Sequence, residues 1–260
     1  MLLEALHRMP DFTRILGSAT PLTLAGLARG AQPLVLADLA RAAHAAGKSG
    51  RCVFVAPDDA AMRGITDAAH FFAPELEVLE FPAWDCLPYD RASPALSVSA
   101  RRLAALHRLQ TPRLGPQLLV TTINALLQRV QTPFRIRESV RLLKPGMEIN
   151  RESLIGLLQR QGYTRTDTVV DAGEYAVRGS IFDIFPSGLD QGLRLDFFGD
   201  ELEVLRLFDP ASQRTTGSVD QHLLLPASEA LLDDDSVKRF RSRYREQFGA
   251  HATSDPLYQA

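Results

Sequence analysis

Two kinds of hydrophobic periodicity alternate along the first 130 residues. Apolar residues recur at helical spacing in three segments, 33–46, 59–72 and 99–109. Short continuous apolar runs, which are typical of buried strands, lie at 52–56, 76–81 and 118–122. Helices that alternate with such strands predict a parallel sheet covered by helices on both faces. Asn124 is placed to cap a further helix over 125–130.

The pattern changes after about residue 130. One helix is expected at 151–161, and strands follow one another at short spacing around it: 137–143, 163–170, 174–185, 193–198 and 201–208. Glycines separate the strands as turns, namely Gly179, Gly188, Gly192 and Gly199. This second pattern predicts an antiparallel α+β domain over residues 131–212.

The last part of the chain, 213–260, begins with a predicted strand at 221–225 and continues with a helix at 237–248. The run from Asp233 to Ser236 is expected to cap that helix and complement its dipole. The helix carries an apolar stripe, which we expect to be buried: Val237, Phe240, Tyr244 and Phe248. Its basic face is expected to be solvated, with DNA binding as the alternative.

Composition and charge narrow the functional class. The chain has 260 residues with 29 Lys and Arg against 31 Asp and Glu, a formal charge of −2, which disfavours a domain that grips nucleic acid by bulk charge. Cys52 and Cys86 fit neither a disulfide framework nor a metal-ligand spacing. Without a run of 18 apolar residues, a cytoplasmic protein with no membrane span is expected. We expect no catalytic residue, metal or cofactor, and the histidines are scattered singly.

Three stretches are long and unusual enough to carry a family resemblance. They are residues 81–90 (Phe-Pro-Ala-Trp-Asp-Cys-Leu-Pro-Tyr-Asp), 173–186 (Gly-Glu-Tyr-Ala-Val-Arg-Gly-Ser-Ile-Phe-Asp-Ile-Phe-Pro) and 194–201 (Arg-Leu-Asp-Phe-Phe-Gly-Asp-Glu). Together they resemble the N-terminal UvrB-homology module of bacterial transcription-repair coupling factors, the Mfd family. That module is itself similar to the excision-repair protein UvrB. The resemblance extends over nearly the whole chain from about residue 12.

The resemblance implies a RecA-like α/β domain, residues 1–130 and 213–260, interrupted by an inserted α+β domain, 131–212, that binds UvrA. It implies a non-catalytic adaptor that recruits UvrA to RNA polymerase stalled at DNA damage. In the family, the polymerase-binding domain, the ATP-dependent translocase on double-stranded DNA and a C-terminal domain that masks the UvrA surface lie further along. Since residues 254–260 look like an unfinished helix start, we expect a truncated chain.

UvrB carries a phosphate-binding loop of the form G-x-x-x-x-G-K-[ST], and the stretch of this chain that matches it is 26–33. Gly26 is retained, but Ala31, Gln32 and Pro33 stand at the three other motif positions. Alanine adds a Cβ near the phosphate, glutamine lacks the cation, and proline has neither hydroxyl nor N–H. The loop is therefore expected to bind no ATP.

The stretch 82–100 leads directly into a helix, whereas in UvrB the matching segment continues into a Tyr-rich hairpin that clamps damaged DNA. Trp84 and Tyr89 are its large aromatic residues, and a structural role at the sheet edge is expected for Trp84. We expect no recognition of damage by this module. Weak DNA binding by Arg101, Arg102 or the 237–248 helix is left open.

The run 193–198 alternates cleanly between apolar and polar positions. Leu193, Leu195 and Phe197 are expected to face the core, which leaves Arg194, Asp196 and Phe198 on the opposite face. An outward phenylalanine is unusual there, and covering of Phe198 by a neighbouring loop is the alternative.

In the family, the inserted domain is the surface that binds UvrA, and Arg178, Arg194 and Phe198 fall on its contact positions. Asp196 lies on the same face and joins them as an expected UvrA-binding residue. Arg165, in a related motif, ranks lower. The main rival is a UvrB-type, ATP-dependent damaged-DNA-binding protein, and the altered phosphate loop argues against it. A small-molecule enzyme is the second rival, for which the sequence offers no nucleophile motif or metal cluster.

Overall fold

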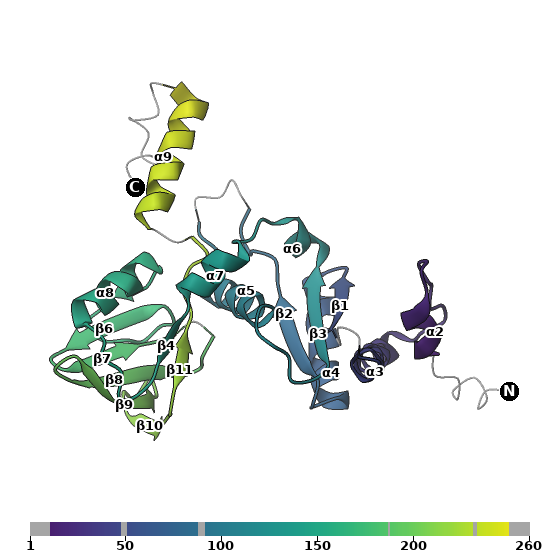
Figure 1. Ribbon diagram of the computed structural model, residues 1–260, viewed down its shortest axis with the longest axis horizontal. Coiled ribbons are helices and arrows are strands. Elements are labelled where there is room, and N and C mark those ends of the chain that lie inside the picture. Colours follow the sequence, from purple (N-terminus) through teal and green to yellow (C-terminus); the bar gives the residue numbers. More distant parts are fainter. Residues whose placement is uncertain (1–10, 48–50, 88–91, 187, 231–232, 250–260) are drawn as a thin grey trace. The chain divides into compact units, whose positions relative to one another are not determined.

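The computed structural model describes residues 11–47, 51–87, 92–186, 188–230 and 233–249. Two compact units, 1–130 and 131–260, are distinguished by their internal contacts. The fold is mixed α and β, with a parallel sheet in the first unit and a largely antiparallel sheet in the second (Figure 1). This confirms the predicted change of architecture near residue 130.

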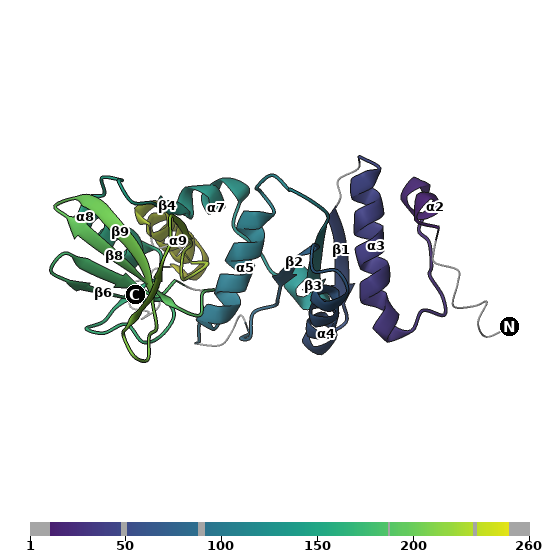
Figure 2. The ribbon, with the colours of Figure 1, turned by 90° about the horizontal axis from the view of Figure 1, so that it is seen from below.

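The first unit is built on three parallel strands in the order β1-β3-β2. The strands are β1 (Arg51–Ala56), β2 (Glu77–Phe81) and β3 (Gln117–Thr122). The helical elements are α2 (Phe12–Gly17), the short η1 (Arg29–Ala31), α3 (Gln32–Ala45), α4 (Asp59–Phe72), α5 (Leu96–Arg108) and α6 (Ile123–Leu127). Helices α3 and α4 lie on one side of the sheet and α5 lies on the other (Figure 2).

Helices cover one face of this sheet more completely than the other. On one face, small residues of α3 and Met62 and Ile65 of α4 pack on Leu118 and Val120. On the other face, α5 packs around Leu119, but Val53 and Val55 of β1 remain 54% and 43% exposed. The prediction of helices on both faces is therefore confirmed for β2 and β3. It is wrong for β1 on the face that carries Val53 and Val55.

The second unit contains a six-stranded sheet in the order β10-β9-β8-β7-β6-β5 and a two-stranded sheet, β11-β4. Its strands are β4 (Arg141–Leu143), β5 (Thr164–Arg165), β6 (Glu174–Arg178), β7 (Ile181–Ile184), β8 (Gly192–Phe198), β9 (Glu201–Phe208), β10 (Thr215–Ser218) and β11 (His222–Leu224). Its helices are α7 (Pro133–Ser139), α8 (Arg151–Arg160) and α9 (Asp234–Phe248). The strand pairs are antiparallel, except that β5 runs parallel to β6.

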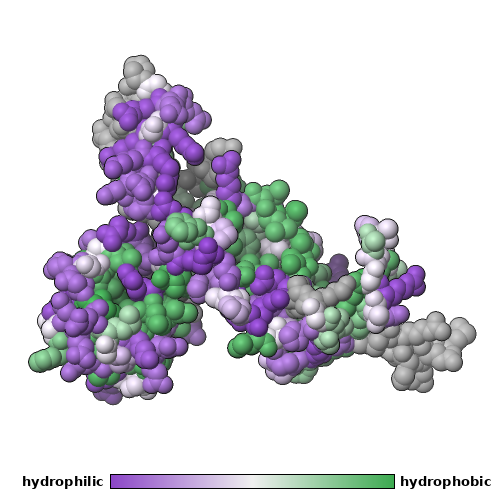
Figure 3. Space-filling view, in the orientation of Figure 1, coloured by the Kyte–Doolittle hydropathy of each residue, from purple (hydrophilic) through white to green (hydrophobic). Residues whose placement is uncertain are grey.

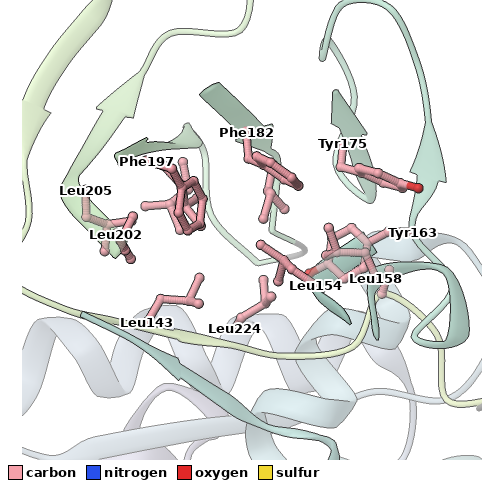
Figure 4. Packing of buried hydrophobic residues seen from close by; sticks show 14 residues of the cluster. Leu143, Leu154, Leu158, Tyr163, Tyr175, Phe182, Phe197, Leu202, Leu205 and Leu224 are labelled. Carbon is pink, nitrogen blue, oxygen red and sulfur yellow. The ribbon is translucent and has the colours of Figure 1, made fainter. Parts of the chain in front are cut away.

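One face of the six-stranded sheet forms the core of the second unit. Phe182 and Phe197 project from it toward Leu154 and Leu158 of α8, and Leu143 and Leu224 close the core from the two-stranded sheet (Figure 4). The rings of Phe182 and Phe197 meet edge to face at 5.4 Å. Leu193, Leu195 and Phe197 are all buried, so the predicted inward face of 193–198 is confirmed.

Three local predictions are wrong. The strand expected at 137–143 is confined to Arg141–Leu143, because Pro133 and Thr132 start a helix that extends to Ser139, with Thr132 accepting a hydrogen bond from the N–H of Arg135. The strand expected at 163–170 is reduced to Thr164–Arg165. Thr122, not Asn124, caps α6, because its hydroxyl accepts from the N–H of Ala125 at 3.3 Å.

Strand pairing continues past the domain boundary expected at 212. Strand β10 pairs with β9, and β11 pairs with β4, so residues 215–224 fold with the second unit. The division of the chain into three domains stays a prediction.

Helix α9 has the predicted cap, but it begins three residues earlier than predicted, at Asp234, and its apolar stripe is not buried as expected. Asp233 accepts a hydrogen bond from the N–H of Ser236 at 2.7 Å, which confirms the cap and lowers the pKa of the Asp233 carboxyl. The predicted burial of the apolar stripe is wrong for the part of the chain that is described, since Phe240 and Phe248 are exposed. The side of α9 visible in Figure 3 is largely hydrophilic.

Gly192 generates a stability prediction. A Cβ at this position would overlap the buried ring of Phe208 on the neighbouring strand. We expect Gly192→Ala to lower the free energy of unfolding by about 1–3 kcal/mol, as overpacking does. Urea denaturation followed by circular dichroism measures the change. Gly217→Ala, whose Cβ meets no atom within 4 Å, is the control, and an equal loss in both variants would contradict the prediction.

Candidate partner-binding face

The side of the six-stranded sheet opposite its core carries a group of charged residues, and we call it the outer face. Asp183 of β7 lies directly opposite Arg194 of β8, which in turn lies opposite Arg206 of β9. In the next row, Ile181 stands between Arg178 and Asp196. Strand pairing therefore gathers the predicted residues Arg178, Arg194 and Asp196 on one surface.

Asp183 is the centre of this group, and its side chain has no exposed surface. Arg194 donates to both of its carboxylate oxygens, from Nε to Oδ1 at 2.7 Å and from Nη2 to Oδ2 at 2.9 Å. Arg178 also donates to Oδ2, from its Nη2. The two arginines that the sequence singled out therefore share one buried carboxylate.

Arg194 is held on several sides, and its side chain is only 15% exposed. Its Nη1 donates to the carbonyl of Gln213 at 3.4 Å, and its guanidinium lies 4.8 Å from the ring centre of Phe208. The hydrogen bond to Asp183 raises the pKa of Arg194 above its ordinary value. Arg194 is thus a fixed part of the domain rather than a projecting cation.

Arg178 is the more accessible arginine, with 49% of its side chain exposed. It precedes the turn at Gly179, whose φ of 61° suits glycine. Arg151, from the start of α8, donates to the carbonyl of Gly179. The N–H of Phe197 donates to the carbonyl of Ser180 at 3.0 Å. These bonds hold the turn beside the end of β8.

Phe198 stands at the end of β8 and is 74% exposed. This confirms its predicted outward orientation and excludes cover by a loop of the described chain. Asp196 forms an ion pair of 3.1 Å with Arg206 in which both side chains are partly exposed. The outer face therefore offers one large apolar side chain next to fixed charged groups. Arg165 lies apart from them on the edge strand β5.

Asp183 was missed by sequence reasoning. The signal available was a carboxylate in the middle of an apolar run, 181–185, which otherwise predicts a buried strand. Its partner could not be read from the sequence, because the register of β7 against β8 sets which arginine lies opposite.

The stretch that matches the phosphate loop lies at the start of α3. Gly26 has a φ of 75°, and Ala31 precedes the helix without a side-chain cap. A pocket of about 720 Å³ adjoins Gln32 and Pro33. Arg29 is the one cation among the residues that line this pocket.

The arginine pair considered for DNA contacts is engaged within the first unit. Arg102 is buried and donates to the carbonyl of Pro82 at 2.8 Å, and it lies 4.3 Å from the ring centre of Phe81. Trp84 is half-buried beside it, in line with a structural role. Arg101 pairs with Glu80 at 3.0 Å. Tyr89 lies outside the described residues.

Within the described ranges, no group of three His, Cys, Asp or Glu side chains is placed to hold a metal ion. Nor does any helix within those ranges have the length and apolar character to cross a membrane.

Residues 142–229 match the family model of the UvrB interaction domain. Most of the chain is also similar to curated transcription-repair-coupling factors. The one from Escherichia coli is 36% identical over 81% of this chain and 18% of its own length. That from Haemophilus influenzae is 40% identical over 66% of this chain and 15% of its own length. That from Myxococcus xanthus is 38% identical over 65% of this chain and 14% of its own length.

The resemblance to transcription-repair coupling factors is confirmed. The chain spans less than a fifth of the length of these relatives. The match to the UvrB interaction domain includes all of β5–β11, and so the entire outer face.

The ion-pair cluster of this domain generates a second stability prediction. Arg194→Ala leaves the buried carboxylate of Asp183 with a single partner, so the free energy of unfolding should fall by about 3 kcal/mol. Arg206→Ala, which breaks a partly exposed pair on the same face, should cost below about 1 kcal/mol. Urea denaturation midpoints at a constant m-value measure the loss of unfolding free energy in both variants. Equal losses would contradict the claim that Arg194 stabilises a buried carboxylate.

Proposed function

We propose that this chain is a non-catalytic adaptor that binds UvrA in DNA repair. The observation that carries the proposal is that the exposed Phe198 and the half-exposed Arg178 lie on the same outer face of the UvrB interaction domain. Large aromatic residues and arginines dominate the binding energy of protein interfaces. A hydrophobic recess on UvrA would receive Phe198, and a carboxylate would pair with the guanidinium of Arg178.

The names of the relatives support the wider setting of the proposal. As part of a transcription-repair coupling factor, the chain would bring UvrA to RNA polymerase stalled at damage, in the cytoplasm. Polymerase binding, ATP-driven translocation on double-stranded DNA and masking of the outer face by a C-terminal domain would belong to the remainder of such a protein.

For the first unit we propose a RecA-like α/β domain that has lost nucleotide binding. Its parallel sheet, which the loop and helix at 26–45 precede in the chain, supports the fold assignment. Gln32 and Pro33 lie where a lysine and a hydroxyl residue would be required. The loop thus separates this proposal from a UvrB-type, ATP-dependent repair protein.

The UvrA proposal predicts a strong effect of Phe198. Truncation of a hot-spot side chain costs about 2 kcal/mol or more, so Phe198→Ala should weaken UvrA binding at least roughly tenfold. Surface plasmon resonance with purified UvrA measures the dissociation constant. Phe71→Ala removes a similarly exposed phenylalanine of the first unit and should leave binding unchanged. Unaltered affinity of the Phe198 variant would exclude this face as the UvrA site.

The loss of nucleotide binding is tested by thermal shift. A chain with micromolar affinity would gain about 4 kcal/mol when ATP–Mg²⁺ is present at a thousand times the dissociation constant, which raises the melting temperature by several degrees. We expect no shift at millimolar ATP–Mg²⁺. A functional P-loop protein measured in parallel is the positive control, and a stabilised adaptor chain would favour the UvrB-type alternative.

A further inference from the structure

Arg178 and Arg194 differ in how many guanidinium nitrogens remain free to donate to a partner. All three nitrogens of the Arg194 guanidinium group donate within the domain, two to Asp183 and one to Gln213. Arg178 donates from Nη2 alone, and its Nε and Nη1 have no acceptor among the described residues. Because Arg178 is also the more exposed of the two, a partner reaches it first.

Asp183 restricts the movement of Arg178. A free arginine side chain samples many rotamers, and binding must remove that freedom. The bond from Nη2 to the buried carboxylate fixes one end of the guanidinium before any partner arrives. The carboxylate itself is fixed, since Arg194 holds both of its oxygens from the neighbouring strand.

The charge balance of the cluster explains why two arginines share one carboxylate. Arg178 and Arg194 contribute two positive charges and Asp183 one negative charge, which leaves a net charge of +1. With Arg194 absent, Asp183 would neutralise Arg178 and compete with a carboxylate of the partner. With Arg194 in place, the excess positive charge is at the exposed guanidinium of Arg178.

We infer that Asp183 is a positioning residue of the outer face, which holds Arg178 ready for an acidic group of UvrA while Arg194 braces Asp183 from within. This inference rests on the proposed function. It assigns direct contact with UvrA to Arg178 and Phe198, and it assigns Arg194 an indirect role through Asp183.

A double-mutant cycle tests the inference with the whole 260-residue chain and purified UvrA. Asp183→Asn keeps the shape of the side chain and removes the charge that holds Arg178. In the otherwise unchanged chain it should weaken UvrA binding roughly fivefold or more. In an Arg178→Ala background it should have less than about a twofold effect, because no positioned guanidinium remains to be lost.

A matched background separates positioning from general loss of structure. Phe198 lies four residues along β8 from Arg194, the residue opposite Asp183, so in a Phe198→Ala background Asp183→Asn should keep its full effect on binding. Circular dichroism melting checks that every variant is folded at the assay temperature. If Asp183→Asn does not fold, Arg194→Lys replaces it in the same cycle, since lysine keeps the charge and loses the bidentate geometry.

Two results would overturn the inference. One is an equal effect of Asp183→Asn with and without Arg178, which would give Asp183 a merely structural role. The other is unchanged affinity of Asp183→Asn in the otherwise unchanged chain. Failure of the proposed function is recognised separately, because the unaltered chain would then not bind UvrA at all.

Discussion

The carboxylate of Asp183 is buried, and its removal from water is tolerated because Arg194 meets it with two hydrogen bonds across β7 and β8 and Arg178 donates a third. That geometry requires one particular register between the two strands. The same register places Phe182 opposite Leu195, both on the core side. A slip of one residue would expose the core residues and separate the ion pair. Hydrophobic packing on one face and charge pairing on the other therefore favour the same arrangement.

What the sequence predicts well is local. The alternation of 193–198 predicts the outward Phe198, and the cap at Asp233 predicts the start of α9. What it predicts poorly depends on partners distant in the chain. The buried pairing of Asp183 is set by strand register, and exposure of the α9 stripe is set by what packs against the helix.

The wrong assignment of 137–143 has a different cause. Thr132 and Pro133 start a helix that extends to Ser139 and so includes the first residues of the predicted strand. The strand of that region survives as Arg141–Leu143, directly after the helix ends. Its residue Leu143 completes the core beneath the outer face. This segment therefore contributes to the core that supports the outer face.

A near-neutral chain is well suited to a surface of this kind. With a formal charge of −2, the chain as a whole exerts little attraction on an acidic partner, so long-range steering contributes little. Selectivity then depends on short-range geometry, on a guanidinium held at a set position and an apolar ring beside it. Such a pairing rejects a merely acidic surface that lacks a recess for Phe198, and an apolar recess that lacks a carboxylate. If the outer face binds UvrA as proposed, the buried Asp183 links domain stability to partner selectivity, because one ion-pair cluster serves both.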